Sequence, residues 1–307
     1  MSFSENVKSD IVRDIPKDKK LIDATLASML HLSSEVVLGK PMKLQFTSNL
    51  MYVIRYFITL IKTNYDVTYD IESRVISRLD NHKVFTCIIN DADNIIKDFN
   101  LLISDDYDLE TEDERIYYLR GAFLSRGSVN DPNSKTSHLE ISHSSNDLIL
   151  FIQKIINSFE LNSRISKRRN NLIVYLKSKN SIGDFLYLLG CRQSMSYYED
   201  TIITKEIEAQ AKRSINLDIA NQDKTNKASV IQLKVIEYLE YNYPLDKLDS
   251  KLLMVMKVRK ENKESSLSEL LDIIHEEYDP YLSKSGLNHR FRKLKEIAEE
   301  YKGSKIL

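Results

Sequence analysis

The sequence of 307 residues predicts an α+β fold, in which a duplicated αββαββα body precedes an all-α domain that contains a helix-turn-helix. Three observations predict it. Two stretches repeat one order of helical and strand-like periodicity, the pattern turns continuously helical after residue 190, and two capped amphipathic helices lie near the end. We expect the first half at residues 1–104, the second half with a connecting helix at 105–219, and the helical domain at 220–307, with its helix-turn-helix at about 266–299.

The first copy of the body begins with an apolar helix at residues 21–34. Strands at 36–38 and 43–46, an apolar helix at 49–65, strands near 67–71 and 84–89, and a helix near 94–102 complete it. The second copy comprises a helix at 115–125, the strand HLEIS at 138–142, a helix at 146–159, a hairpin at 164–177 that turns at Asn170 and Asn171, and a helix at 182–190. Both copies therefore predict the same unit.

The helix that opens the second copy carries the nonapeptide LRGAFLSRG at residues 119–127, which resembles the LAGLIDADG helix of homing endonucleases. Such a two-metal phosphodiesterase needs a carboxylate at the eighth position, because hard divalent cations take oxygen ligands. Arg126 stands there, and Ser33 stands there in the matching segment LASMLHLSS at 26–34. We expect a LAGLIDADG-like body whose two central helices pack together beneath a saddle of strands, with no catalytic residue. A purely structural interpretation also stands, because Gly121 and Gly127 allow close backbone approach.

Composition indicates a globular intracellular protein. Cys87 and Cys191 have no metal-ligand spacing, so we expect two reduced, buried thiols. The N-terminal segment MSFSENVKSD is polar, and no apolar run reaches the roughly 20 residues that span a bilayer. The seven glycines form no phosphate-binding cluster. We expect a cytoplasmic, nucleoid-associated protein with no cofactor, no bound metal and no membrane partner.

The formal net charge is −1, but charge is segregated along the chain. Residues 91–114, which join the two halves, are strongly acidic, with Lys97 as their one base. Residues 161–183 carry bases and no acid, mostly on the predicted hairpin. Four of these bases are candidate secondary DNA contacts: Arg164, Lys167, Arg168 and Arg169. The alternative is a solvated hairpin whose edge is protected by charge.

Beyond the body, a helix at 202–218 leads into the polar stretch IANQDKTNKAS at 219–229, where we place the domain linker. Helices follow at 228–241 and, after Pro244, at 248–260. Two more carry the helix-turn-helix signal, the first capped by Ser266 and the second by Ser283 or Ser285, with a break at Pro280. In the last helix Leu287, Phe291, Leu294 and Ala298 recur at helical spacing with Ile297 beside them, so we expect them to face the core.

The opposite side of the last helix presents side chains suited to reading DNA. Arginine pairs with guanine and asparagine with adenine in the major groove, while serine and lysine contact phosphates. The candidate DNA-binding residues are Lys284, Ser285, Asn288, His289, Arg290, Arg292, Lys293 and Lys295. We assign base reading to Asn288, His289 and Arg292. The alternative is a solvated amphipathic helix with cations toward its C-terminal half.

The histidines do not predict a metal site. His289 has no Cys, Asp or second His at i±3 or i±4, and His138 and His143 flank a predicted strand. We expect all three to be surface or strand-edge residues.

Three longer segments resemble the WhiA family of bacterial regulators over nearly the whole chain. They are YYLRGAFLSRGSVNDP at 117–132, ANQDKT at 220–225 and SKSGLNHRFRKL at 283–294, together with Arg213 and Asn216. Leu217 stands where many members have a cysteine, and Arg126 replaces a small residue of the signature. The resemblance implies a degenerate LAGLIDADG body tethered to a C-terminal helix-turn-helix.

The resemblance also implies a non-catalytic, sequence-specific DNA-binding regulator, associated with cell division and chromosome segregation, and with sporulation in sporulating relatives. Double-stranded DNA is the expected partner, and the body could hold another regulator or RNA polymerase. An active nuclease would need an acid at Ser33 or Arg126. The remaining alternative is a division-linked scaffold that does not bind DNA, with the acidic residues 105–114 as its docking segment.

Overall fold

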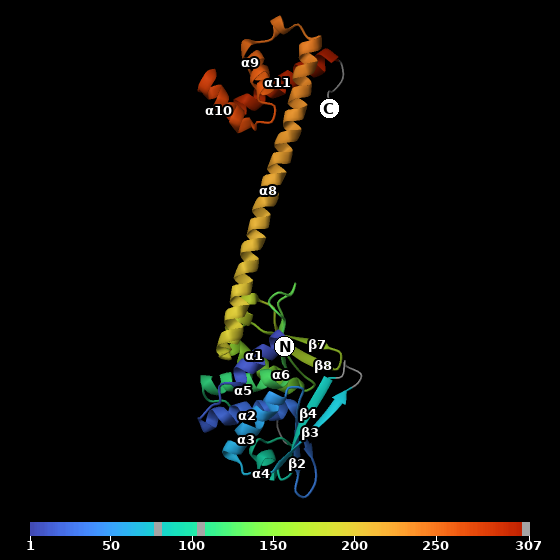
Figure 1. Ribbon diagram of the computed structural model, residues 1–307, viewed down its shortest axis with the longest axis vertical. Helices are drawn as coiled ribbons and strands as arrows, with labels where there is room; N and C mark the ends of the chain where they lie inside the picture. Colours follow the sequence, from blue (N-terminus) through green and yellow to red (C-terminus); the bar gives the residue numbers. More distant parts are fainter. Residues whose placement is uncertain (77–81, 103–107, 303–307) are drawn as a thin grey trace. The chain divides into compact units, whose positions relative to one another are not determined.

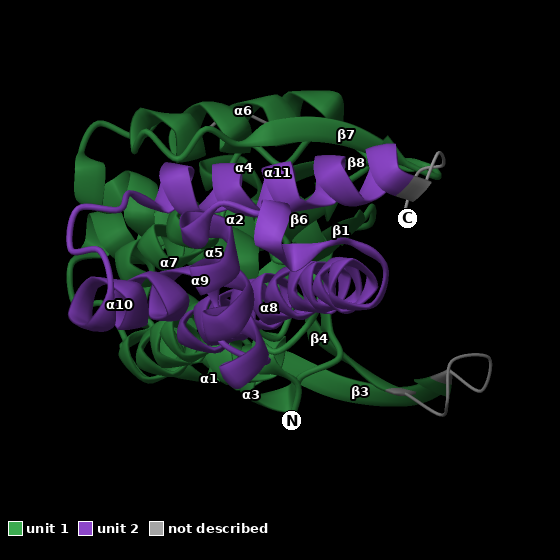
Figure 2. Ribbon diagram, turned by 90° about the horizontal axis from the view of Figure 1, so that it is seen from above, with its two compact units in different colours: residues 1–206 green, residues 207–307 purple. Residues whose placement is uncertain are grey.

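The computed structural model describes residues 1–76, 82–102 and 108–302, and the chain divides into two compact units, residues 1–206 and 207–307. Figure 2 colours the two units separately. The boundary lies within one helix, earlier than the boundary at 219/220 that the sequence suggested. The three-part division of the chain remains a prediction.

The first copy of the duplicated body has the predicted order of elements. It consists of α2 (Lys19–Ser33), β1 (Ser34–Val37), β2 (Lys43–Ser48), α3 (Met51–Asn64), β3 (Tyr69–Ile76), β4 (His82–Ile89) and α4 (Asp93–Asp98). The strands form an antiparallel sheet in the order β1-β2-β4-β3. The apolar stripe of α3 faces the sheet, and Phe46 stacks on Phe57 with ring centroids 4.1 Å apart.

The second copy repeats the first. It consists of α5 (Glu112–Arg126), β5 (Gly127–Val129), β6 (Leu139–His143), α6 (Asn146–Ser158), β7 (Arg164–Arg168), β8 (Asn171–Leu176) and α7 (Lys179–Leu188), with sheet order β5-β6-β8-β7. The equivalent strand order confirms two pseudo-symmetric halves. Figure 1 shows the helices of this unit on one side and the strands on the other.

Two details of the second copy differ from the prediction. β5 has only three residues directly after a helix, too few to show an alternating pattern, so the sequence did not reveal it. The β7–β8 turn lies one residue earlier than expected, because Asn171 already pairs with Arg168 and Arg169 takes the positive φ of 55°. A left-handed arginine is uncommon.

The central helices α2 and α5 approach so closely that Gly121 has no room for a side chain. A Cβ at this position would collide with the Oγ of Ser28 and the backbone oxygen of Thr25 on α2. The buried side chains of both helices belong to one apolar core that also includes α3, α6 and the inner faces of both sheets. Gly121, the first glycine of the nonapeptide, therefore allows α5 to pack closely against α2.

The N-terminal segment is a helix, α1 (Phe3–Val12), although its polar composition gave no such prediction. Ser2 and Glu5 form a capping box, and Phe3, Val7 and Ile11 are buried at helical spacing. This pairing of a cap with an i, i+4 stripe was the signal in the sequence that we overlooked.

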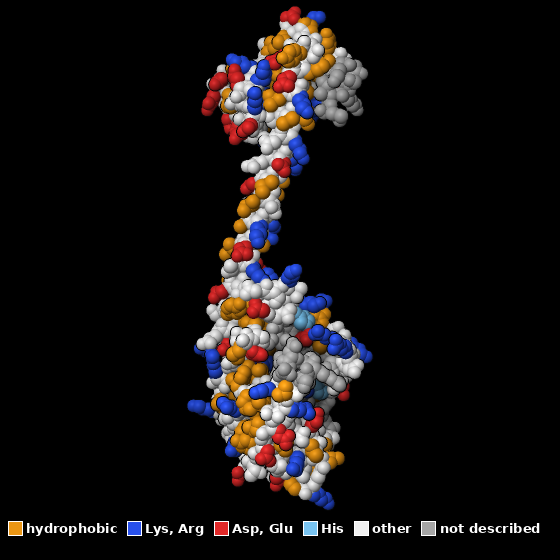
Figure 3. Space-filling view, turned by 45° about the vertical axis from the view of Figure 1, so that its right-hand side comes forward, with side chains coloured by type: hydrophobic (Ala, Val, Ile, Leu, Met, Phe, Trp, Pro, Cys, Tyr) orange, Lys and Arg blue, Asp and Glu red, His pale blue; other side chains and the backbone are white. Residues whose placement is uncertain are grey.

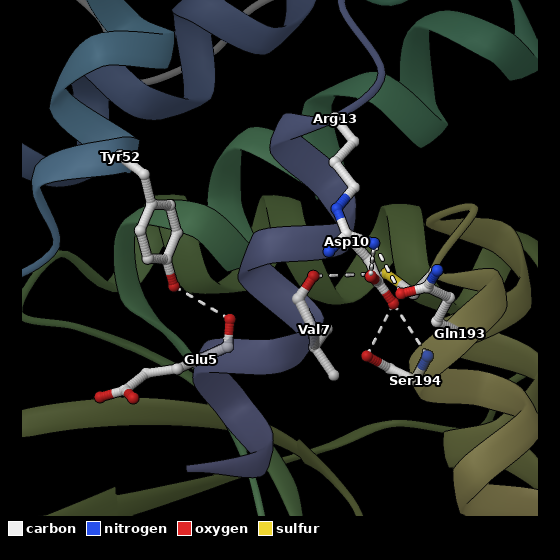
Figure 4. Close-up of polar contacts among 8 residues, drawn as sticks. Glu5, Val7, Asp10, Arg13, Tyr52, Gln193 and Ser194 are labelled. Carbon is white, nitrogen blue, oxygen red and sulfur yellow. Dashed lines mark hydrogen bonds and ion pairs between the residues drawn. The ribbon is translucent and has the colours of Figure 1, made fainter. Parts of the chain in front are cut away.

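The start of α8 (Arg192–Asn242) is held by α1, as Figure 4 shows. Asp10 accepts hydrogen bonds from the backbone N of Ser194 at 2.8 Å and from its Oγ at 2.7 Å. Arg13 donates to Oε1 of Gln193 at 2.6 Å, and Tyr52 donates to the backbone oxygen of Glu5 at 2.9 Å. Asp10 therefore caps a helix that begins far away in sequence.

Residues 219–229, the predicted linker, are helical and lie inside α8. Their polar composition suggested a break, but the whole helix contains neither glycine nor proline, and the first such residue after it is Pro244. Polarity alone does not interrupt a helix when every side chain can be solvated.

The two cysteines agree with the prediction, since Cys87 and Cys191 are free and buried. Burial raises the pKa of each thiol to about 12, so both are neutral. No helix in the described part of the chain is long and apolar enough to cross a membrane.

Candidate nucleic-acid interface

The C-terminal unit is built from the end of α8, a 3-10 turn η1 (Leu245–Lys247), α9 (Ser250–Glu261), α10 (Leu267–Glu277) and α11 (Lys284–Lys302). One apolar core holds these helices together, with contributions from every helix, among them Ile236, Val255 and Ile274. The predicted core face of α11 is confirmed, because Leu287, Phe291, Leu294 and Ala298 are buried and Ile297 is partly buried.

Both predicted caps are present, one at the N-terminus of α10 and one at the N-terminus of α11. Ser266 and Glu269 form a capping box at α10, with the Ser266 N donating to Glu269 Oε2 at 2.6 Å. This bond from a backbone N–H is the main reason that the pKa of Glu269 is lowered. At α11 the cap is Ser283, whose Oγ accepts from the backbone N of Gly286 at 3.0 Å, which decides between the two candidate serines.

Polar side chains fix the turn between these helices. His275 Nε2 lies 2.7 Å from the backbone oxygen of Leu282, so α10 holds the residue that precedes the cap of α11. Arg290 forms an ion pair with Asp279 at 3.3 Å, and only 14% of its side chain is exposed. Lys284 donates to Oγ of Ser268 at 2.7 Å. One of these contacts joins α11 to α10 directly, one joins α10 to the end of the turn, and one joins α11 to the start of the turn.

Arg259 is a buried cation that the sequence analysis missed. Its side chain is 2% exposed, donates to the backbone oxygens of Asn262 and Ser265, and lies 5.6 Å from the ring centroid of Phe291. Burial lowers its pKa to about 10, so it stays charged at neutral pH. The signal was its phase, because Leu252, Val255 and Arg259 lie on one face of α9. Arg259 links the loop before α10 to the inner face of α11.

The predicted DNA-binding residues differ in how free they are. Five side chains are exposed with no ion pair or hydrogen bond to another described side chain: Ser285, Asn288, His289, Arg292 and Lys293. Lys284 and Arg290 have the partners given above, and Lys295 lies 3.7 Å from Glu299. Arg292 is at the centre of the exposed stripe, which turns acidic toward the C-terminus at Glu296 and Glu299. The N-terminal half of α11 is the part whose chemistry suits DNA.

Acids and bases occupy different areas of this unit. The outer face of α10 exposes Asp272, Glu276 and Glu277, whereas α11 exposes Arg292 and Lys293. Figure 3 shows acidic side chains gathered at one edge of the unit and basic ones over its middle. Of these two helix faces, that of α11 has the sign of charge that DNA attracts.

In the body, the two positions that matter for nuclease chemistry come together. Ser33 ends α2 and Arg126 ends α5, and both line the same pocket. Arg126 donates from Nε to the backbone oxygen of Leu32 at 2.9 Å. In the described residues no three His, Cys, Asp or Glu side chains gather at metal-binding distance.

The four basic residues of the β7–β8 hairpin do not share one face of the sheet. Arg164 and Arg168 alternate with Ile165 and Lys167, and Ile165 packs against the core. Arg164 and Arg168 therefore lie on the open face, Lys167 on the opposite face, and Arg169 in the turn. Arg168 also forms an ion pair with Glu140 at 3.1 Å, whose other oxygen lies 2.8 Å from Nε2 of His138. The contact of Arg164, Lys167, Arg168 and Arg169 with DNA remains a prediction.

His138 directly precedes β6 and His143 is its last residue, so both lie at the ends of the strand. His138 bonds to Glu140, and Nδ1 of His143 accepts from the backbone N of Ser145 at 3.1 Å. Neither arrangement is a metal site.

Comparisons with known proteins match both units. Family models match the WhiA LAGLIDADG-like domain at residues 115–208 and the WhiA C-terminal HTH domain at residues 211–298. The probable cell division protein WhiA of Alkaliphilus metalliredigens is 30% identical over 100% of both chains, and that of Staphylococcus epidermidis is 33% identical over 98% of this chain and 97% of its own. The crystal structure of full-length DUF199/WhiA from Thermatoga maritima has the same fold, with a TM-score of 0.62 and 23% identity over 98% of this chain and 99% of that one.

Proposed function

Because the chain belongs to the WhiA family, we propose that it is a sequence-specific DNA-binding transcriptional regulator that reads the major groove with α11. One observation carries this proposal: the N-terminal half of α11 exposes Ser285, Asn288, His289 and Arg292 on one side, while its other side is buried in a helix-turn-helix core. A helix held in this way can enter a groove without losing its fold.

Within α11 the side chains divide into two roles. Asn288, His289 and Arg292 read base edges, with arginine suited to guanine and asparagine to adenine. The remaining candidates contact phosphates and set the register of the helix: Lys284, Ser285, Arg290, Lys293 and Lys295. For Arg290 this requires that a phosphate replace Asp279 as its partner, since the two side chains are 3.3 Å apart in the free protein.

The body acts without catalysis in this proposal. Ser33 and Arg126 occupy the two positions that would carry metal-binding acids, and an arginine repels divalent cations. Supercoiled plasmid incubated with the protein and magnesium is expected to stay uncut, and nicking by the unaltered protein would contradict the proposal. Arg164, Arg168 and Arg169 add a sequence-independent contact to the DNA backbone, with Lys167 outside that face.

The biological setting follows from the relatives. Proteins 30% and 33% identical to this chain carry the name probable cell division protein, so we assign this regulator to genes of cell division and chromosome segregation, and to sporulation in relatives that sporulate. It acts on the nucleoid in the cytoplasm, together with another regulator or RNA polymerase.

Genome-wide immunoprecipitation of the full-length protein tests the proposal. The comparison is with a variant in which Asn288 and Arg292 are both replaced by alanine, and with a control, Lys247→Ala, whose exposed side chain belongs to η1 and not to α11. Discrete peaks that share a motif, vanish in the double variant and persist in the control support a regulator that reads DNA through α11. Peaks that persist in the double variant would move DNA recognition elsewhere.

A scaffold without DNA binding is the second candidate. Exposed apolar residues on α8, among them Ile207, Ile215 and Ile219, favour a protein partner. The acidic segment 105–114 that the sequence suggested for docking lies partly outside the described residues. If the double variant restores normal division in cells that lack the protein, the scaffold candidate is correct.

A further inference from the structure

A polar pocket of about 490 Å³ opens where α2 and α5 end. Its volume lies within the range of roughly 300–1,000 Å³ of ligand sites, but polar side chains dominate its walls where most ligand sites are apolar. Four charged residues line it: Glu35 on β1, Glu72 and Arg74 on β3, and Arg126 on α5. All of them belong to the first unit.

Arg126 is fixed by a hydrogen bond that leaves its terminal nitrogens available. Its Nε donates to the backbone oxygen of Leu32 at 2.9 Å, and neither terminal nitrogen has a partner among the described residues. The two terminal nitrogens of a guanidinium present a pair of parallel N–H groups, and the spacing of this pair matches that of two phosphate or carboxylate oxygens. The guanidinium of Arg126 is therefore held in a position from which it can bind an oxyanion.

The other charged groups of the pocket have no ion-pair partner among the residues that the structure describes. Among described residues, Arg74, Glu35 and Glu72 form no ion pair with one another or with Arg126, although all four line one space. Ser33 is only 7% exposed, and its Oγ has no hydrogen-bond partner in the described chain. The hydroxyl of Ser33 at the wall of the pocket is therefore available to donate to a ligand.

A second cation, Lys8, lies close enough to Arg126 to be affected by its charge. Lys8 on α1 is buried, and its pKa falls to about 8, first because of burial and second because Arg126 is near. A bound anion beside Arg126 would offset this repulsion, whereas a cation would increase it. The charges near Arg126 therefore favour an anionic group of a ligand over a cationic one at this end of the pocket.

We propose that this pocket binds a phosphate group carried by a small, hydroxyl-bearing molecule of the nucleotide class. Arg126 and Arg74 hold the phosphate, Ser33 donates to it, and Glu35 and Glu72 accept hydrogen bonds from the hydroxyls of the sugar. An acidic side chain on ribose hydroxyls is a recurrent arrangement in nucleotide sites. In this proposal Ser33 and Arg126, which occupy the positions of the metal-binding acids of a nuclease, form part of a ligand site instead.

Isothermal titration of the full-length protein with AMP, inorganic phosphate and adenosine is the first test. AMP is expected to bind, phosphate to bind about tenfold or more weakly because the hydroxyl contacts are lost, and adenosine to give no heat. Absence of binding by both AMP and phosphate at millimolar concentration would overturn the proposal.

Variants then locate the site. Arg126→Gln and Arg74→Gln are each expected to weaken AMP binding about tenfold or more, and Glu72→Gln to weaken AMP binding but not phosphate binding. Arg55→Gln is the matched control, because Arg55 is exposed on α3 outside the pocket. Arg126 also bonds to the backbone of Leu32, so Arg126→Gln could fail to fold. In that case the AMP affinity of Arg74→Gln decides the test. Full AMP affinity in Arg74→Gln would overturn the proposal.

A last arm identifies the source of the phosphate. A short DNA duplex of arbitrary sequence is titrated against the AMP complex. No displacement supports a small ligand. Displacement, together with weaker duplex binding in Arg126→Gln, would assign the pocket to the DNA backbone and overturn the small-ligand assignment. Reading of a specific site by α11 is measured separately, so failure of one result leaves the other intact.

Discussion

α5 and α11 carry the most distinctive motifs of the chain, and they are buried in opposite ways. Residues 118–124 of α5 are all buried, so the helix is enclosed on every side. On α11, burial returns only at every third or fourth residue, which leaves one face open. A recognisable motif can therefore report packing in one helix and molecular recognition in another, and only the second keeps a surface for a partner.

Substitution of Gly121 tests the packing role of α5 and carries the largest expected effect. Gly121→Leu places a side chain where even a Cβ collides with α2, so it should destabilise the first unit by about 3 kcal/mol or more. Denaturant unfolding followed by circular dichroism measures the loss. Gly183→Ala on α7 is the control, because its Cβ would meet only Glu199 Oε1 at 3.9 Å. Equal stability of both variants would refute the close-packing account.

Substitution of Arg292 tests the recognition role of α11. Arg292→Ala should weaken binding to a cognate site by about 1–3 kcal/mol and relax preference at one base pair, with no change in folding. Fluorescence anisotropy with single-base variants of the site gives both quantities. Lys247→Ala should leave them unchanged. Unaltered base discrimination in Arg292→Ala would end the assignment of that residue.

A charge buried beside α5 gives the third prediction. Lys8 has a pKa of about 8 in the folded protein against 10.5 when unfolded, so the folded state loses its proton first. Below pH 8 the cost of burying the charge is fully present, and stability should rise between pH 8 and 10.5. Lys8→Met should stabilise the protein by about 1–2 kcal/mol at pH 7 and abolish the Lys8 part of that rise. Exposed Lys17→Met is the control, and a less stable Lys8→Met would contradict the prediction.

The smallest effect is expected at the cap of α10. Ser266→Ala removes the hydroxyl that accepts from Glu269 N, and should cost about 1 kcal/mol in the second unit while leaving α5 and its surroundings intact. Hydrogen exchange, resolved by segment, distinguishes the two units. Faster exchange throughout the first unit would contradict the prediction, because it would show that the stability of that unit depends on the cap of α10.

Local patterns in the sequence were sufficient for much of the fold. Apolar periodicity gave the order of elements in both copies and the buried face of α11, and the cap at Ser266 was legible because capping depends on neighbours three residues away. These features are set by residues close in sequence.

Features set by distant residues were not predictable in the same way. The ion pair of Arg290 with Asp279 depends on the path of the turn, and the pocket that joins Ser33 to Arg126 depends on how two halves meet. Two further features had a signal in the sequence: strand alternation places Lys167 on the face opposite Arg164 and Arg168, and the absence of glycine and proline favours an unbroken α8. The DNA-contacting residues of α11 remain predictions, since an exposed face shows availability and not a partner.

The bond from Asp10 to Ser194 spans 184 positions of the chain, which gives it a consequence for biosynthesis. The ribosome synthesises α1 before both copies of the repeat. The N–H and hydroxyl groups of Ser194 that donate to Asp10 emerge only after both copies have been made. The earliest helix thus completes its contacts among the last in the body. A nascent chain that stalls before residue 194 therefore leaves the Asp10 carboxylate without these two donors.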